Sequence, residues 1–148
     1  MWGILIALLS GLLMSVQGVM NTGVTKQTSI WVSAGFVQLS AFIVCTVAWL
    51  CTGRQNISAL LKVSPKYMLL GGIIGAFITI TVIKSMELLG PAKAVLLIVV
   101  MQIISAYLIE LFGILGTEKT EFKLGKLIGA VVCIIGIIIF FMTGKENS

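Results

Sequence analysis

Polar side chains interrupt the first apolar stretch of the chain, and the spacing of three of them is the first indication of chemistry. Ser10, Gln17 and Asn21 follow one another at intervals of seven and four residues, so an α-helix carries all three on one stripe. An amide in hydrocarbon loses its hydrogen bonds, so Gln17 must face other protein groups or a wet cavity. We expect this stripe to bind a solute, and hydrogen bonding between helices is the alternative role for Gln17.

A second polar group lies in the fourth apolar stretch. Gln102 and Glu110 are eight residues apart, which is about 80° around a helix, so they can line one broad face. Ser105 lies beside Gln102, and we predict that both contact the solute. For Gln102 the alternative is again a hydrogen bond between helices, worth about 0.6 kcal/mol. Two such amides on different helices favour a polar cavity.

Glu110 is the only charged residue between Lys93 and Glu118. A carboxylate inside a membrane is by default a proton carrier or a cation site, and we predict that Glu110 couples transport to protons. In the alternative, Glu110 is a helix-end carboxylate that reaches headgroup water or pairs with a loop lysine such as Lys119 or Lys123.

A further carboxylate, Glu87, is the second candidate for proton coupling. It follows Lys84 by three residues, and this spacing places the two side chains within reach of each other on a helix. The alternative is therefore a simple ion pair.

Five apolar stretches must position these groups. Hydrophobic residues make up 59% of the chain and charged residues 10%, whereas a soluble domain carries about 25% charged residues. A helix that crosses a bilayer core of ~30 Å needs roughly 20 apolar residues. The sequence therefore predicts an all-α integral membrane protein, with one transmembrane domain over residues 1–148 and multiple passes through the cell membrane. The expected helices are about 2–22, 30–52, 66–89, 92–115 and 122–143.

Composition also excludes several functions. The net charge is +5, but the basic residues lie at helix ends, where they meet lipid phosphates, so we expect membrane lipids and no nucleic acid as partners. The chain has no His and no Asp, and its three Cys lack metal-ligand spacing. We expect no metal, no cofactor and no enzymatic activity.

Charge balance and helix number bear on assembly. Five helices place the two termini on opposite sides, with six basic residues on the side of the N-terminus and four on the other. So weak a bias predicts that the chain inserts in both orientations. Five helices hardly enclose an aqueous path alone, so we expect a homodimer.

Glycine and proline mark breaks and packing sites. Gly53 ends the second helix, and Asn56 caps a short helical segment after it. Gly71 and Gly75, Gly125 and Gly129, and Gly11 and Gly18 recur at helical spacing. Small residues let helices approach closely in membranes, so we expect packing within the chain, with a subunit interface on the last helix as the alternative.

Four segments carry a resemblance to a known family: the run from Gly11 to Asn21, the stretch from Leu70 to Phe77, the run from Gln102 to Gly113, and Gly125-x-x-x-Gly129. They resemble the YdcZ-like five-helix family of the drug/metabolite transporter superfamily. The chain departs from the family pattern at Met101, where Gly is usual, and at Glu110, where Asp is usual.

The resemblance implies a five-helix half of a ten-helix transporter, assembled as an antiparallel pair, that moves a small molecule by alternating access. It does not supply a substrate. Gln17 occupies the middle of the helix that holds a Glu in the related small multidrug-resistance proteins, so their antiport is not carried over. We expect a homodimeric secondary transporter for a small polar or amphipathic solute. The alternatives are a passive dual-topology channel and a non-transporting accessory subunit.

Overall fold

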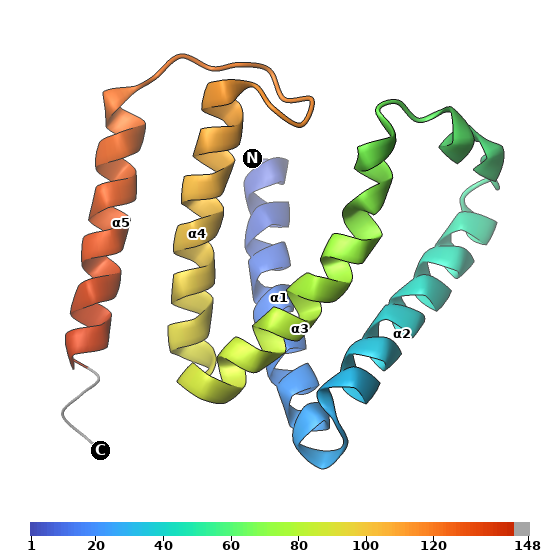
Figure 1. Ribbon diagram of the computed structural model, residues 1–148, viewed down its shortest axis with the longest axis horizontal. Coiled ribbons are helices and arrows are strands. Elements are labelled where there is room, and N and C mark those ends of the chain that lie inside the picture. Colours follow the sequence, from blue (N-terminus) through green and yellow to red (C-terminus); the bar gives the residue numbers. More distant parts are fainter. Residues whose placement is uncertain (144–148) are drawn as a thin grey trace. The chain divides into compact units, whose positions relative to one another are not determined.

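The computed structural model describes residues 1–143, and over these residues the chain is helical and contains no strand. Five helices of the described part are long and apolar enough to cross a membrane, if the short 3-10 helix η2 is counted with α3 (Figure 1). This confirms the predicted all-α membrane fold. The elements are α1 (Trp2–Gln27), α2 (Ile30–Cys51), η1 (Ile57–Lys62), η2 (Lys66–Leu70), α3 (Gly71–Leu89), α4 (Pro91–Phe112) and α5 (Leu124–Thr143).

The chain divides into two compact units, an N-terminal unit, Met1–Pro91, and a C-terminal unit that begins at Ala92. The N-terminal unit holds α1, α2 and α3, and the C-terminal unit holds nearly all of α4 and all of α5. That residues 1–148 form one transmembrane domain stays a prediction.

The turn between α1 and α2 is shorter than expected, because α1 continues to Gln27 instead of ending near residue 22. Thr28 ends the helix, and its hydroxyl donates to the Val24 carbonyl at 2.8 Å. Ser29 then caps α2, since its side-chain oxygen accepts the Val32 N–H at 3.2 Å, which satisfies a donor that has no partner inside the helix.

Glycines in the left-handed region end two of the helices. After α2, Gly53 has a φ of +107°, and the Arg54 N–H donates to the Trp49 carbonyl at 3.2 Å. After α4, Gly113 has a φ of +63°, and the Ile114 N–H donates to the Ile109 carbonyl at 3.2 Å. Both are Schellman motifs, which favour glycine at the left-handed position.

The structure ends α2 next to Gly53, as expected, and differs from the expected helix ends on both sides of the loop between α4 and α5. The Gly113 cap stops α4 at Phe112, short of the predicted residue 115, and α5 begins at Leu124, after the predicted residue 122. The predicted cap at Asn56 is confirmed, because its side-chain oxygen accepts the Ser58 N–H at 2.9 Å.

Packing in the N-terminal unit centres on a close approach of α1 to α3 (Figure 1). A methyl group placed at Gly18 would lie 2.5 Å from the terminal carbon of Met86 and 3.4 Å from Val82. A side chain at Gly18 therefore requires the end of the Met86 side chain to move. Buried residues of this unit come from all three helices: Gly18, Asn21, Thr22, Ser33, Ala34, Ile83 and Met86.

The other glycine motifs lie open. A methyl group at Gly71, Gly75, Gly125 or Gly129 would meet no other described atom within 4 Å, and the same is true of Gly11. The expectation that these motifs pack helices together is therefore not met inside either unit, and only Gly18 has the predicted role.

Candidate functional site

A groove of about 570 Å³ lies between α4 and α5 in the C-terminal unit. Most of its wall is aliphatic, and its charged groups are Glu110 and Lys126. Small side chains of α5, Gly129 and Ala130, leave room on one side. The full lining is Ile103, Ile104, Ala106, Tyr107, Leu108, Glu110, Leu111, Phe122, Lys126, Leu127, Gly129, Ala130 and Cys133.

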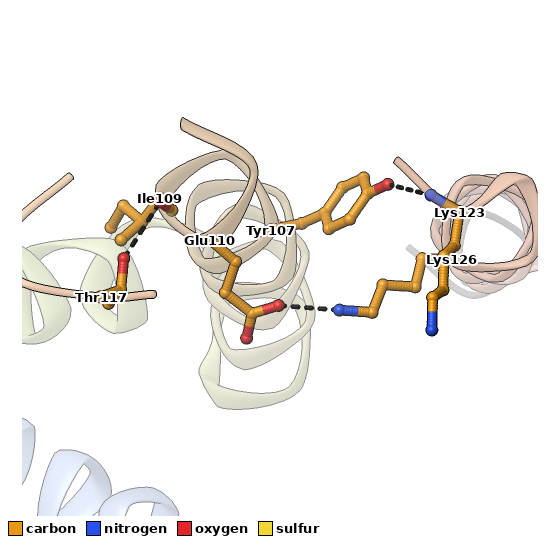
Figure 2. A network of polar contacts seen from close by, with 6 residues as sticks. All are labelled: Tyr107, Ile109, Glu110, Thr117, Lys123 and Lys126. Atoms are coloured by element: carbon orange, nitrogen blue, oxygen red, sulfur yellow. Dashed lines mark hydrogen bonds and ion pairs between the residues drawn. The ribbon is translucent and has the colours of Figure 1, made fainter. Parts of the chain in front are cut away.

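Glu110 and Lys126 form an ion pair across this groove (Figure 2). The Lys126 ammonium nitrogen lies 2.8 Å from a Glu110 carboxylate oxygen, and the side chains are 46% and 45% exposed. The same ammonium lies 5.4 Å from the centre of the Tyr107 ring, within the range of a cation–π interaction. One cation therefore contacts a carboxylate and an aromatic face together.

Tyr107 also supports the start of α5. Its hydroxyl oxygen accepts the backbone N–H of Lys123 at 3.2 Å (Figure 2). The first N–H groups of a helix have no partner inside the helix, so this bond satisfies a donor at the N-terminus of α5 and fixes the Tyr107 ring beside Lys126.

The loop after α4 folds back on the helix end and holds the Glu110 backbone. The Thr120 N–H donates to the Glu110 carbonyl at 2.9 Å, and the Thr117 hydroxyl donates to the Ile109 carbonyl at 3.2 Å (Figure 2). These bonds cap carbonyls that the last turn of a helix leaves free. The loop thereby fixes the position from which the Glu110 side chain extends.

Both charges of the pair lie at the unfavourable ends of their own helices. Glu110 is in the last turn of α4 and Lys126 is in the first turn of α5. The helix dipole favours cations at the C-terminus and anions at the N-terminus, by about 0.3–1 kcal/mol for each charge. Neither charge therefore helps its own helix, and their mutual pairing explains their positions better than helix stability does.

A second contact joins the opposite ends of the same helices. The Lys93 ammonium, near the start of α4, lies 5.6 Å from the centre of the Phe141 ring, near the end of α5. Between these two contacts, the described backbones of α4 and α5 do not approach each other closely. Side chains near both ends thus bridge α4 and α5, which run antiparallel (Figure 1), and the groove lies between these contacts.

The predicted solute contacts of α4 do not line this groove. Gln102 and Ser105 are exposed and absent from the groove wall. They lie about 140° and 160° around the helix from Tyr107, which is at the middle of the wall. The C-terminal unit by itself therefore does not bring Gln102 and Glu110 to one site, and the binding role of Gln102 and Ser105 stays a prediction.

The predicted stripe on α1 lies in two different environments. Ser10 and Gln17 are exposed, whereas Asn21 is buried. The Asn21 carbonyl accepts the Ser33 hydroxyl of α2 at 3.0 Å, and the Ser10 hydroxyl donates to its own helix, at the Ile6 carbonyl. Asn21 is thus at a helix contact, and the solute-binding role of the three residues stays a prediction.

The two predicted acidic residues both have lysine partners. Glu87 accepts Lys84 at 3.1 Å, which confirms the ion pair expected from their spacing. Glu110 pairs with Lys126 and not with the loop residues Lys119 or Lys123. Lys126 lies in the first turn of α5, and its side chain lines the groove toward α4.

Some polar contacts were missed from the sequence. The Gln38 amide of α2 donates to the Thr79 hydroxyl of α3 at 3.4 Å, and this is the interhelical role that had been considered for Gln17. The signal was present, since an amide in the middle of an apolar span needs a partner. Lys126 and Tyr107 were missed because their importance depends on the pairing of α4 with α5.

Five apolar helices, with a charge pair in a groove between the last two, define the class as a multi-pass membrane protein. Residues 2–139 match the family model described as "Putative inner membrane exporter, YdcZ". The chain belongs to this family, which confirms the resemblance seen in the sequence. No curated protein and no solved structure matches the chain.

The family match also places the protein in the cell. A family of the inner membrane, together with the five apolar helices described, identifies a multi-pass protein of the inner membrane. The family name indicates membrane export, and thus a transporter in preference to an enzyme.

Proposed function

We propose that the protein exports a small amphipathic solute across the inner membrane by alternating access, with proton coupling at Glu110. The observation that carries this proposal is the Glu110–Lys126 ion pair in the wall of an otherwise apolar groove. Groove volumes of roughly 300–1,000 Å³ suit small molecules, and about 570 Å³ lies within that range.

The pair is suited to a reversible step. Both side chains are nearly half exposed, and exposed ion pairs contribute only about 0.2–1 kcal/mol. When Glu110 takes up a proton it loses its charge, and the Coulomb attraction to the Lys126 ammonium is lost. The polar link between α4 and the first turn of α5 therefore weakens. Protonation thereby changes how firmly the two helices are joined, which alternating access requires.

Assembly as an antiparallel homodimer completes the proposal. Charge balance gives the chain little preference for one orientation, and two copies supply ten helices around a shared path. In this arrangement Ser10, Gln17, Asn21, Gln102 and Ser105 contribute solute contacts, and Glu87 is the alternative to Glu110 as the coupling carboxylate. Reporters fused to the C-terminus that work on only one side of the membrane test this point, and a single uniform orientation would exclude the antiparallel pair.

Proton flux in liposomes tests the function itself. Vesicles that contain the protein and an internal pH dye are challenged with cationic, anionic and neutral amphipathic solutes. We expect one class of solute to drive a proton flux. Glu110→Gln should remove this flux. Glu87→Gln, the matched control because Glu87 is also paired with a lysine, should retain it. A flux retained in Glu110→Gln but lost in Glu87→Gln moves the coupling role to Glu87. Absence of flux with every class refutes proton-coupled transport of these solutes, and solute-independent ion currents indicate a channel.

A further inference from the structure

The Lys126 ammonium already occupies the groove beside Glu110 and the Tyr107 ring, and it indicates which class of ligand the groove binds. We infer that Glu110 and the Tyr107 ring form a site for an amphipathic organic cation, and that the Lys126 ammonium is a tethered competitor for that site. This inference rests on the proposed function and deepens it, because it names the class of solute and the residue that opposes its binding.

The first argument is the chemistry around the ammonium. Lys126 lies 2.8 Å from a carboxylate oxygen and 5.4 Å from the centre of an aromatic ring. Both groups attract cations, since the face of an aromatic ring carries negative potential. An anionic ligand would meet only one favourable group, Lys126, and would be repelled by Glu110 and by the Tyr107 face. The site is therefore selective for positive charge once Lys126 leaves it.

The second argument is that Lys126 can leave without any movement of the backbone. Its side chain is 46% exposed and lies in the first turn of α5. Lysine reaches water from a helix end by extending its flexible stem. A ligand cation thus displaces a side chain and not a helix, while Lys126 keeps its charge in solvent.

The third argument is the shape of the rest of the groove. Apart from the ion pair and the Tyr107 hydroxyl, its wall consists of aliphatic, aromatic and thiol groups. This surface extends along α5 as far as Cys133, about two turns beyond Lys126. A ligand that combines positive charge with a largely apolar surface therefore matches the groove, whereas a small inorganic cation leaves most of it unfilled.

Equilibrium binding of two isosteric probes tests the sign of the charge. Tetraphenylphosphonium and tetraphenylborate have similar shapes and opposite charges. Each is titrated against the protein in lipid nanodiscs, and binding to empty nanodiscs is subtracted. We expect saturable binding of tetraphenylphosphonium only, and tighter binding of tetraphenylborate would overturn the inference.

Variants test the role of each side chain. Lys126→Gln removes the competitor and is expected to tighten tetraphenylphosphonium binding about two- to fivefold. Glu110→Gln is expected to weaken binding about fivefold or more. Tyr107→Leu is expected to weaken it about two- to fivefold, and Tyr107→Phe, which keeps the ring but loses the hydroxyl that accepts the Lys123 N–H, should weaken it less. Lys84→Gln is the matched control, because Lys84 also pairs with a carboxylate, and it should leave binding unchanged.

The native cysteines show where the probe binds. Cys133 lines the groove, whereas Cys45 and Cys51 are on α2 in the N-terminal unit, and all three are exposed free thiols. Tetraphenylphosphonium should slow alkylation of Cys133 by N-ethylmaleimide, measured by mass spectrometry, without changing Cys45 or Cys51. This readout needs no substitution, so it does not depend on whether a variant folds.

The outcomes separate the inference from the proposed function. Unchanged affinity in both Lys126→Gln and Glu110→Gln, or equal alkylation of Cys133 with and without the probe, overturns the inference. Proton flux driven by an anionic or neutral solute, with no cation binding, also overturns it but leaves transport standing. Specific cation binding without any proton flux in liposomes supports the cation site and refutes proton-coupled transport.

Discussion

The contact between α1 and α3 at Gly18 allows the packing of the N-terminal unit to be tested with a single methyl group. In Gly18→Ala the new Cβ would lie 2.5 Å from the terminal carbon of Met86 and 2.8 Å from its sulfur. Ordinary van der Waals contact begins near 3.4 Å, so the Met86 methyl group must retreat by about 0.9 Å (3.4 minus 2.5). Met86 is only 4% exposed, but the crowded atoms are the far end of its flexible side chain, so they can shift at moderate cost.

Two opposing terms set the magnitude. Overpacking of a filled site costs about 1–3 kcal/mol, whereas replacing Gly by Ala inside a helix gains up to ~1 kcal/mol in helix propensity. Gly18→Ala should therefore lose about 1 kcal/mol in the free energy of unfolding. Gly11→Ala is the matched control on the same helix, because no described atom lies within 4 Å of its new methyl group, and it should gain up to ~1 kcal/mol.

Thermal loss of helical circular dichroism in detergent measures both variants. A difference of about 2 kcal/mol between the two sites corresponds to roughly 4–8 °C for a chain of this size. Met86→Ala removes the atoms that clash, so in that background Gly18→Ala should no longer cost stability. Equal shifts at Gly11 and Gly18, or an undiminished cost in the Met86→Ala background, would refute the proposed close approach.

Two further predictions concern an amide that joins two helices and a helix end. Gln38→Leu should lower stability by about 0.6 kcal/mol and remove any further effect of Thr79→Val, because these side chains share one hydrogen bond; additive losses in a double-mutant cycle would contradict this. Gly113→Ala should cost about 1–2 kcal/mol, because φ is +63° and the new Cβ would lie 3.0 Å from the Lys119 Cβ. Gly113→Asn should lose less, since Asn tolerates the left-handed region, and equal thermal shifts would count against the strain argument.

Features that depend on local sequence were predictable. The five spans follow from runs of apolar residues, the end of α2 follows from Gly53, and the ion pair of Lys84 with Glu87 follows from a spacing of three residues. Each depends only on residues close together in the chain, so the periodicity of the helix was sufficient to infer it.

Features that depend on how helices face each other were not predictable in the same way. Lys119, Lys123 and Lys126 all follow Glu110 in sequence, and only the rotation of α5 selects Lys126 as the partner. Gly11 and Gly18 lie seven residues apart on one face of α1, each between a polar and an aliphatic residue. Of these two, only Gly18 lies close to another helix. Spacing identifies which residues share a face of a helix, whereas it contains no information about which face meets a neighbour.

The ion pair has a consequence for the biogenesis of the protein. Glu110 precedes Lys126 by 16 residues, so the ribosome synthesises the carboxylate of α4 before the lysine that neutralises it. Until α5 lies beside α4, Glu110 lacks its lysine partner and the groove wall of α4 has no opposite side. The pair therefore favours entry of α4 and α5 into the membrane together, as one helical hairpin.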